Sequence, residues 1–267
     1  MEPDQPMIPP PNSSTDRLSG KIAIVTGGAS GIGESTARLF AQHGATIIIA
    51  DIQDDKGRQI ASEIGNHRCT YIHCDVTDEH QVKSAIDLAI TLHGTLDIMF
   101  SNAGIFGSAS QTIVDLDLNN LDRVYTVNVR GMAACVKHAA RVMIERRVKG
   151  SVICTGSVMS VQGGKTAPDY TISKHAVLGL VRAASQQLGL YGIRVNCVSP
   201  FGVSTPMSCG AFGTSPEEME VLIEPFTPLK GVVLKTKHVA DAVLFLASDD
   251  SAFINGHNIV LDGGFTA

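Results

Sequence analysis

Tyr170 and Lys174 are the residues whose types and spacing most directly suggest acid–base chemistry. They stand four positions apart in Tyr170-Thr171-Ile172-Ser173-Lys174, so a helix would place both on one face. A free tyrosine titrates near ~10 and is almost wholly neutral at pH 7, but a nearby lysine ammonium favours the phenolate and lowers that pKa. The pair therefore indicates a phenol that exchanges a proton with an alcohol or carbonyl, although an isolated pair of this spacing is more often plain helix surface.

Ser157 and Asn128 are two further polar residues in apolar surroundings. Residues 151–155 predict a buried strand, and Ser157 follows its carboxyl end, where ligands meet open α/β sheets. Ser157 could bind a substrate oxygen, or it could simply cap a turn. Asn128 interrupts an apolar helical run, so it is either a site residue or a core amide whose hydrogen bonds are satisfied.

A glycine-rich segment lies between an apolar strand, predicted at 22–26, and a helix, predicted at 32–43. Its spacing is Gly27-x-x-x-Gly31-x-Gly33. Glycine allows positive φ and close approach of the backbone to a ligand, and the helix that follows directs its N–H groups toward an anion. Strand, glycine-rich turn and helix together predict a phosphate-binding loop rather than an ordinary flexible turn.

Asp51 ends the second apolar strand, roughly twenty residues beyond the glycines. A dinucleotide-binding fold places its ribose-binding acid at this point. Ser30 and Ile52 flank the expected site without positive charge, whereas binding of a ribose 2′-phosphate favours a nearby cation. The pattern therefore predicts NAD rather than NADP.

Strand and helix patterns alternate from residue 20 onward. Near-continuous apolar strands alternating with helices predict a mostly parallel sheet covered on both faces. We therefore expect one α/β domain over 18–267, a Rossmann-type, doubly wound, mostly parallel seven-stranded sheet with helices on both faces. The expected strands are 22–26, 46–50, 69–74, 97–101, 150–155, 193–198 and 257–261, and the expected helices are 32–43, 54–64, 78–93, 117–147, 170–190 and 236–248.

Two segments depart from this alternation. Residues 1–17 hold five prolines among polar residues and predict a disordered tail. The tail lacks the apolar core of a secretory signal and carries acidic residues that transit peptides avoid, so we expect a cytosolic protein. Residues 203–233 mix prolines and glycines with apolar residues, and a loop of this length usually serves as a lid or binding loop.

Composition excludes several classes of function. The net charge is −5 and no basic run is visible, so neither nucleic acid nor a membrane surface is an expected partner. No apolar stretch approaches the ~20 residues of a membrane span. The six cysteines show no clustering with each other or with histidines, so we expect reduced thiols and neither disulfides nor a bound metal.

Taken together, the motifs resemble those of the short-chain dehydrogenase/reductase family. They occur in the same order as in that family, and the match covers about residues 18–265. Each motif is weak alone, whereas the set is specific. Residues 197–203 and 261–266 are similar to plant alcohol dehydrogenases of secondary metabolism, which act on alcohols such as borneol, isopiperitenol, xanthoxin and secoisolariciresinol. The matching motifs are Thr26-Gly27-x-x-x-Gly31-Ile32-Gly33, Asp75-Val76, Asn102-Ala103-Gly104, Asn128, Ser157 and Tyr170-x-x-x-Lys174.

The resemblance implies a role for each catalytic residue. Tyr170 would be the acid/base, and Lys174 would lower its pKa and bind the nicotinamide ribose. Ser157 would orient the substrate oxygen, and Asn128 would support a water that connects Lys174 to solvent. The implied cofactor-binding residues are Gly27, Ser30, Gly31, Ile32, Gly33, Asp51, Ile52, Asp75, Val76, Asn102, Ala103, Gly104, Tyr170, Lys174, Val203 and Thr205.

The expected substrate is apolar. No arginine or lysine occurs between Gly202 and Leu229, so that segment offers no clamp for a carboxylate or phosphate. We therefore expect NAD-dependent oxidation of an apolar, cyclic, terpenoid-like secondary alcohol, such as a borneol-type monoterpenol, to its ketone. The expected substrate-binding residues are Ile105, Phe106, Ser157, Met159, Tyr170, Phe201, Met207 and Phe212.

Other interpretations stay open at this point. The substrate could be a larger phenolic, lignan or steroid-like alcohol, or the enzyme could be an NADPH-dependent ketone reductase. A non-catalytic dinucleotide sensor is the remote alternative, disfavoured because all four expected catalytic residues are present. One position departs from the family pattern. The family usually has Pro-Gly after the sixth strand, whereas this chain has Phe201 between Pro200 and Gly202. The resemblance also implies a homotetramer packed through 117–147 and 170–190.

Overall fold

Apolar segments of four to seven residues form the sheet in the computed structural model, which describes residues 16–267. The strand order is β3-β2-β1-β4-β5-β6-β7, and every neighbouring pair is parallel. The predicted seven-stranded sheet is therefore confirmed, and it is wholly parallel. The strands are β1 (Ile22–Thr26), β2 (Thr46–Asp51), β3 (Cys69–His73), β4 (Ile98–Ser101), β5 (Ser151–Thr155), β6 (Arg194–Pro200) and β7 (Asn258–Leu261).

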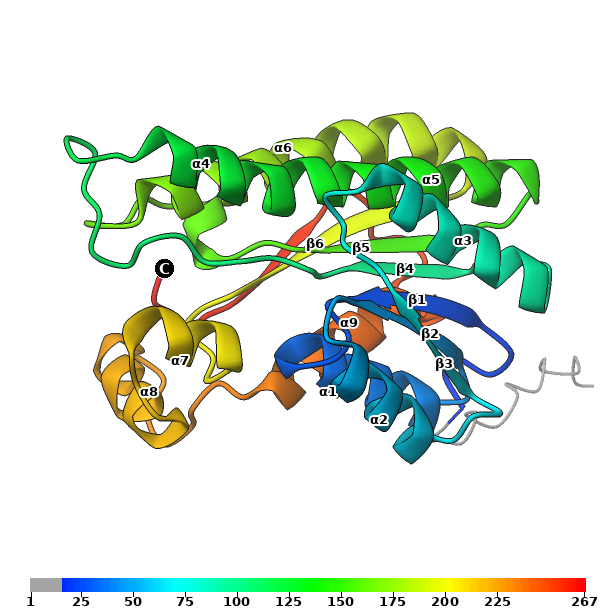
Figure 1. Cartoon of the computed structure of the whole chain (residues 1–267), viewed down its shortest axis with the longest axis horizontal. Helices are drawn as coiled ribbons and strands as arrows, with labels where there is room; N and C mark the ends of the chain where they lie inside the picture. Colours follow the sequence, from blue (N-terminus) through cyan, green and yellow to red (C-terminus); the bar gives the residue numbers. More distant parts are fainter. Residues whose placement is uncertain (1–15) are drawn as a thin grey trace, which may run out of the picture.

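Helices cover both faces of the sheet (Figure 1). The central strands β1, β4 and β5 are buried along their whole length, as expected when both faces are covered. One face carries α3 (Glu79–His93), α4 (Leu118–Tyr125), α5 (Met132–Glu145) and α6 (Pro168–Leu188), and the other carries α1 (Gly31–Gln42), α2 (Asp54–Ile64) and α9 (Thr236–Ala247). Each layer forms its own apolar core against the sheet.

The helix predicted at 117–147 is not continuous. A π-helical segment, η1 (Thr126–Gly131), separates α4 from α5, so the prediction of one regular helix was wrong. Single π turns are frequent at functional sites. This one contains Asn128, and Gly131 in it packs so closely on Val76 that an added Cβ would lie 2.8 Å from a Val76 methyl. An irregular turn therefore lies where the helix passes the carboxyl ends of the strands.

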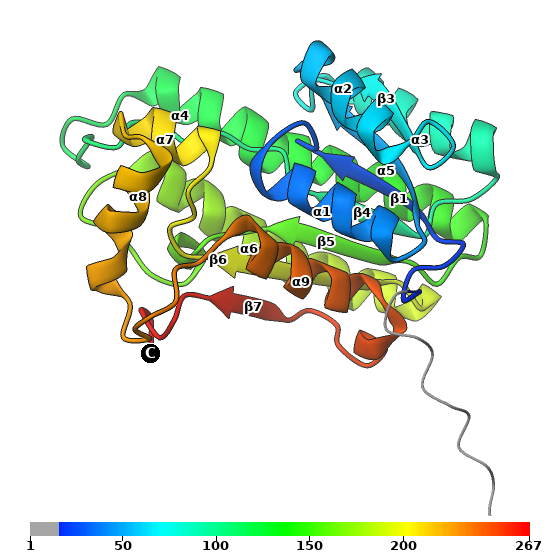
Figure 2. The ribbon, with the colours of Figure 1, turned by 90° about the horizontal axis from the view of Figure 1, so that it is seen from below.

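The segment 203–233, predicted as a loop, contains two helices and a 3₁₀ turn. These are α7 (Pro206–Phe212), α8 (Pro216–Ile223) and η4 (Glu224–Phe226). Thr205 and Ser215 cap the two helices, and a proline starts each of them. The segment lies at one end of the molecule, beside the C-terminus (Figures 1 and 2).

The predicted tail at 1–17 falls mostly on positions 1–15, which lie outside the described residues. Arg17, which we assigned to the tail, pairs with the Asp250 carboxylate at 2.5 Å, and Leu18 is fully buried. No helix within 16–267 is long and apolar enough to cross a membrane.

The strand order reverses between β1 and β4. β2 and β3 extend the sheet from β1, whereas β5, β6 and β7 extend it from β4. In open parallel sheets a ligand binds in the crevice outside the carboxyl ends of the strands at such a switch point. The fold therefore places a ligand between the loops that follow β1 and β4.

The turn after β1 generates a stability prediction. A Cβ at Gly33 would lie 2.0 Å from the Gly27 carbonyl oxygen, whereas a Cβ at Gly179 in α6 would have no atom within 4 Å. We expect Gly33→Ala to lower the free energy of unfolding by about 2 kcal/mol, because overpacking forces the backbone to move. Gly179→Ala should be neutral or stabilise by up to about 1 kcal/mol, because alanine favours helix. Equal urea-denaturation midpoints for the two variants would contradict this packing argument.

Candidate active site

Asn102 joins the carboxyl ends of three neighbouring strands. Its side-chain Nδ2 donates to the Thr26 carbonyl at 3.1 Å, and its Oδ1 accepts from Thr155 Oγ1 at 3.0 Å. Its backbone N–H donates to Thr26 Oγ1 at 2.9 Å. β1, β4 and β5 therefore end in one hydrogen-bonded group, which forms the floor of the crevice. Sequence reasoning placed Asn102 along the cofactor but did not identify the contributions of Thr26 and Thr155.

The glycine-rich turn suits an anion. Gly27 and Gly31 adopt φ values of +63° and +56°, which favour glycine. Ser30 precedes α1 but its side chain makes no capping hydrogen bond. Within the described residues, the N–H groups at the start of α1 therefore have no side-chain cap, and they face the crevice with the positive end of the helix dipole. This is the donor set that a diphosphate requires, so the turn fits a dinucleotide.

Asp51 is fixed at the end of β2. It is 5% exposed, and its two carboxylate oxygens accept from the backbone N–H groups of Ala29 and Gln53, each at 2.9 Å. A carboxylate has about four acceptor positions, so hydroxyls of a ribose have room to bind. Ile52 beside it is 61% exposed and offers an apolar surface for a base.

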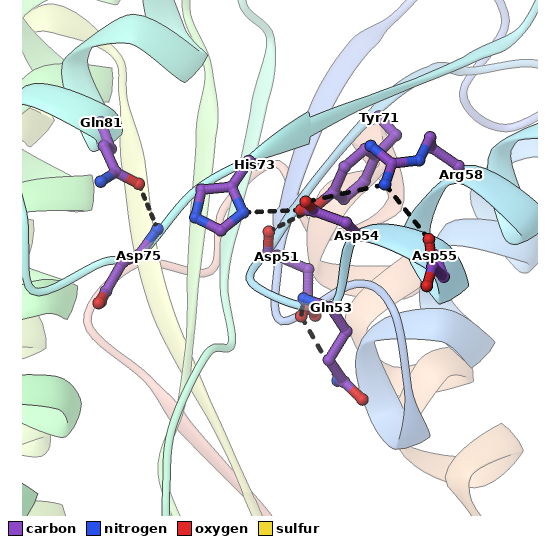
Figure 3. A network of polar contacts seen from close by, with 9 residues as sticks. All are labelled: Asp51, Gln53, Asp54, Asp55, Arg58, Tyr71, His73, Asp75 and Gln81. Carbon is purple, nitrogen blue, oxygen red and sulfur yellow. Dashed lines mark hydrogen bonds and ion pairs between the residues drawn. The ribbon is translucent and has the colours of Figure 1, made fainter.

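The loop after β3 forms the other side of this region. Asp75 Oδ1 accepts from both the N–H and the hydroxyl of Thr77, and the Asp75 N–H donates to Gln81 Oε1 at 2.8 Å. Figure 3 shows Asp75 on the same edge of the sheet as Asp51. Val76 is buried against Gly131. The structure therefore brings these predicted cofactor residues to one edge.

Thr205 and Val203 have different surroundings, although both were predicted to contact the cofactor. Thr205 lies against the glycine-rich turn, because a Cβ at Gly31 would come within 3.3 Å of its side chain. Val203 is 5% exposed and belongs to the apolar core on the α1 and α9 face. Thr205 is thus beside the anion site, whereas the Val203 side chain is part of the core.

Tyr170 and Ser157 meet at the carboxyl end of β5. Tyr170 lies in the first turn of α6 and is 7% exposed, and the Ser157 side chain is near enough to its hydroxyl to lower the pKa of Tyr170. Ser157 also accepts from the Met159 N–H at 3.2 Å and caps the short turn η2 (Val158–Ser160). The capping role considered for Ser157 is therefore confirmed, whereas its binding of a substrate oxygen stays a prediction.

Lys174 lies one helical turn further along α6. It is 3% exposed, its ammonium donates to the Thr155 carbonyl at 2.8 Å, and its Nζ lies 5.4 Å from the centre of the Tyr170 ring. The predicted i, i+4 arrangement on one helix face is present. The lysine and the tyrosine therefore border the same volume above β5.

The protein alone does not lower the pKa of Tyr170, contrary to our expectation. Burial raises the pKa of Tyr170 to about 12, and the hydrogen bond from Ser157 offsets only part of that rise. Burial likewise lowers the pKa of Lys174 to about 8. Loss of water therefore disfavours the charged form of each group more strongly than its neighbours favour that form.

Asn128 is a fully buried amide with a complete set of partners. Its Oδ1 accepts from the Ile105 N–H at 2.8 Å, and its Nδ2 donates to the Ile105 carbonyl at 2.9 Å and to Ser173 Oγ at 3.1 Å. The side chain thus holds the chain after β4 against α6. Its predicted support of a water beside Lys174 stays a prediction.

Asp169 was missed from the sequence. It is fully buried directly before Tyr170, and its Oδ1 accepts from the Tyr170 N–H at 2.7 Å. Its Oδ2 accepts from Asn120 Nδ2 at 2.5 Å and from the more distant Ser108 N–H at 3.4 Å. The sequence did contain a signal for Asp169, since it is an acidic residue in the first turn of a helix and directly precedes the tyrosine. It ties the loop after β4 and helix α4 to the start of α6.

Aromatic side chains cover Tyr170. The Phe106 ring stacks on it with ring centres 4.4 Å apart, and Phe212 of α7 lies 5.7 Å from Phe106. Phe201 instead lies against Phe265, near the C-terminus, with the two tilted rings 4.3 Å apart between centres. The structure thus groups two of the predicted substrate-binding aromatic residues with the tyrosine.

The remaining predicted substrate-binding residues have less direct relations to Tyr170. Ile105 is fixed through its backbone by Asn128. Met159 is partly buried beside the loop at Gly164, and Met207 on α7 is 41% exposed.

Burial of the Lys174 ammonium generates a second stability prediction. The lowered pKa means that the charged form costs about 3 kcal/mol in the folded state below pH 8, at 1.36 kcal/mol per pKa unit. Lys174→Met removes this cost but leaves the Thr155 carbonyl without its donor, a loss of about 1 kcal/mol. We expect the variant to be more stable by about 2 kcal/mol at pH 7 in urea denaturation, and inactive.

The sign of this effect can be checked with pH. Between about pH 8 and the unfolded-state pKa near ~10.5, folded Lys174 binds fewer protons than the unfolded chain does. Stability from this group therefore rises with pH in that range, and the advantage of Lys174→Met should shrink there. A variant that is less stable than the natural protein at every pH would contradict the assignment of a strained ammonium.

Comparison with known proteins agrees with this geometry. A family model described as enoyl-(acyl carrier protein) reductase matches residues 27–266. The (+)-cis,trans-nepetalactol synthase NEPS1 of Nepeta racemosa is 54% identical over 93% of this chain and 92% of that protein. The (-)-isopiperitenol/(-)-carveol dehydrogenase, mitochondrial, of Mentha piperita is 51% identical (94% and 96%), and secoisolariciresinol dehydrogenase of Forsythia intermedia is 50% identical (94% and 90%).

Solved structures show the same architecture. A short-chain type dehydrogenase/reductase from Mycobacterium marinum superposes with a TM-score of 0.86 at 33% identity, covering 95% of this chain and 98% of the other. Levodione reductase gives the same TM-score at 28% identity, covering 92% and 98%. The match between motifs, fold and relatives identifies the chain as a member of the short-chain dehydrogenase/reductase family.

Proposed function

We propose that this protein oxidises an apolar cyclic secondary alcohol to its ketone, with NAD as the hydride acceptor. Family membership supplies the oxidoreductase class and the use of a nicotinamide dinucleotide. The observation that carries the proposal is the burial of Tyr170, Ser157 and Lys174 together at the end of β5, with the Lys174 ammonium 5.4 Å from the centre of the Tyr170 ring. A sensor that only bound dinucleotides would not need this arrangement.

The side chains divide the chemistry among them. NAD bound in the crevice would supply the acceptor for the hydride that leaves the carbinol carbon of the alcohol. Ser157 and Tyr170 would hold the alcohol oxygen, and the Tyr170 phenolate would take the hydroxyl proton of the alcohol as the carbonyl forms. The Lys174 ammonium binds ribose hydroxyls with the donors that Thr155 leaves free and favours the tyrosinate.

Asp51 supports the preference for NAD. Its carboxylate is fixed by two backbone N–H groups and remains available to ribose hydroxyls. A 2′-phosphate about 4 Å away would be repelled by up to ~4 kcal/mol at an effective dielectric near ~20, and solvent at the rim reduces this. An NADPH-dependent reductase is therefore the less favoured alternative.

The apolar substrate is supported by the surroundings of Tyr170. Phe106 stacks on Tyr170 and Phe212 lies beside Phe106, and burying a hydrocarbon against these rings contributes about 25 cal/mol for each Å². A carboxylate or phosphate would lose water beside these rings without gaining a cation. The named substrates of two relatives, isopiperitenol or carveol and secoisolariciresinol, are alcohols, which leaves a larger phenolic, lignan or steroid-like alcohol as the main alternative.

A homotetramer remains part of the proposal, on the strength of the family resemblance. Its support here is a groove of about 580 Å³ between α5 and α6, with a largely apolar lining that includes Val136, Ala140, Leu180 and Ala184. A second copy of this face would fill it. The cytosolic location expected from the sequence also stays a prediction, and the printed name of the Mentha piperita relative places that protein in mitochondria.

Cofactor choice is the first functional prediction. We expect kcat/KM with NAD to exceed that with NADP at least tenfold, since ~1.4 kcal/mol of the repulsion from Asp51 is enough for that ratio. Initial rates of alcohol oxidation with each cofactor measure it. Asp51→Asn should narrow the ratio. Comparable efficiency with both cofactors in the natural protein would remove the assignment.

Tyr170→Phe tests the acid/base. The variant should lose about 10²- to 10⁴-fold in turnover, because the proton acceptor is gone, while it still binds NADH. In the natural protein, oxidation should accelerate as pH rises, because the reaction needs the deprotonated tyrosine. Stopped-flow rates over a pH series and NADH titration of the variant provide both readouts. Near-normal turnover in the variant would exclude Tyr170 from the mechanism.

A substrate panel tests the pocket. Borneol-type monoterpenols, a steroid alcohol, a lignan diol and a short 2-hydroxy acid would be incubated with NAD, and NADH formation followed by absorbance. We expect the highest kcat/KM with a cyclic monoterpenol, because it fills an apolar site and offers one hydroxyl. Strong activity on the hydroxy acid, with none on any apolar alcohol, would contradict the proposal.

A further inference from the structure

Tyr71 links the turn that carries Asp51 to helix α2. Its hydroxyl lies 2.7 Å from the main-chain carbonyl oxygen of Asp51 and 2.6 Å from Asp54 Oδ1 (Figure 3). The hydroxyl has a single proton, which it shares between these two acceptor oxygens, so it links the Asp51 main chain to the Asp54 side chain. Tyr71, which belongs to β3, thus holds the main chain of Asp51, the expected ribose-binding acid.

The Tyr71 ring has a site shaped for it. A Cβ at Gly57 of α2 would lie 2.2 Å from two carbons of the ring, so only glycine leaves room for it there. The Arg58 guanidinium lies 5.8 Å from the ring centre, above its face. Tyr71 therefore has a fixed ring as well as a fixed hydroxyl, which is what a positioning residue needs.

Asp54 holds this arrangement together through charge. It accepts from Tyr71 and from His73 Nδ1 at 2.7 Å, and these hydrogen bonds lower the pKa of Asp54. Burial and the neighbouring Asp54 carboxylate raise the pKa of Tyr71, so its proton stays in place at neutral pH. The pair therefore keeps one proton and one negative charge beside the Asp51 turn.

The nearby cations are already engaged. Arg58 lies 3.7 Å from an Asp54 oxygen and 3.3 Å from an Asp55 oxygen. Lys56 donates to Gln53 Oε1 at 3.0 Å. A 2′-phosphate at this edge would therefore meet carboxylates before it met a free cation.

We propose that Tyr71 and Asp54 are specificity-determining positioning residues for the cofactor. Tyr71 holds the main chain of Asp51 where its carboxylate meets the ribose, and Asp54 anchors Tyr71 while keeping Arg58 away from the 2′ position. The proposal rests on the proposed use of NAD. In this proposal the preference for NAD over NADP depends on Tyr71 and Asp54 as well as on Asp51.

Three conservative variants separate the possible causes. Tyr71→Phe keeps the ring against Gly57 but removes the hydroxyl, and Asp54→Asn removes the charge. Asp55→Asn is the matched control, because it removes the same charge and the other Arg58 partner but has no contact with Tyr71. Dissociation constants for NADH and NADPH would be measured by cofactor fluorescence, which the tryptophan-free chain does not obscure, with thermal melting as a check on folding.

We expect Tyr71→Phe to weaken NADH binding about 3- to 10-fold, the range for one lost hydrogen bond, with no comparable loss for NADPH. Asp54→Asn should narrow the NADH/NADPH preference by at least about 3-fold, and Asp55→Asn should change it less than twofold. The effects of Tyr71→Phe and Asp54→Asn should not add in the double variant, because they break one bridge.

Each contrary result has a distinct meaning. If the natural protein prefers NADH but Tyr71→Phe and Asp54→Asn melt earlier and keep its preference within twofold, the two residues are only structural and the inference is wrong. If Asp55→Asn matches Asp54→Asn, net charge rather than the bridge sets the preference, which also overturns it. If the natural protein binds both cofactors equally, the proposed NAD dependence itself fails.

Discussion

A lysine ammonium buried without a carboxylate is the constraint on which the rest of the site depends. Lys174 is 3% exposed, and the hydrogen bond that it makes within the described chain goes to the Thr155 carbonyl. An ammonium has three donors, so two remain, and its pKa is lowered to about 8 as a result of burial. The folded protein thus carries a strained group that a ligand with hydroxyl acceptors would relieve, at the expense of stability in the free protein.

The fold provides the rigidity that such a group needs. Asn102 joins the ends of β1, β4 and β5. The Thr155 carbonyl, which accepts the hydrogen bond of Lys174, therefore cannot move independently of the glycine-rich turn. Asn128 and Asp169 fix the chain after β4 to α6 from two sides. These buried polar side chains are satisfied mostly by backbone groups, which is how a parallel sheet positions chemistry at its carboxyl edge.

Patterns that are local in sequence predicted the most. β1 and α2 have their predicted bounds, because an apolar run and an amphipathic period each show in a short window. The π-helical turn at Thr126–Gly131 escaped prediction. Asn128 within it bonds Ile105, 23 positions away, and a short sequence window does not report such a contact. The helices of the predicted lid were not predicted, because the prolines in that segment indicated a loop. The capping box Ser215-x-x-Glu218 is nevertheless visible in the sequence. The pKa of Tyr170 depends on burial, which sequence spacing does not report.

The central claim is that Tyr170, Ser157 and the relieved Lys174 ammonium act on a substrate beside bound NAD. A crystal structure of the complex with NADH tests it most directly. We expect the hydroxyls of the nicotinamide ribose to accept hydrogen bonds from Lys174 and to contact the Tyr170 hydroxyl, and the other ribose to bind Asp51. A cofactor bound with its nicotinamide turned away from Tyr170, or with Lys174 still bonded to Thr155 alone, would contradict the account.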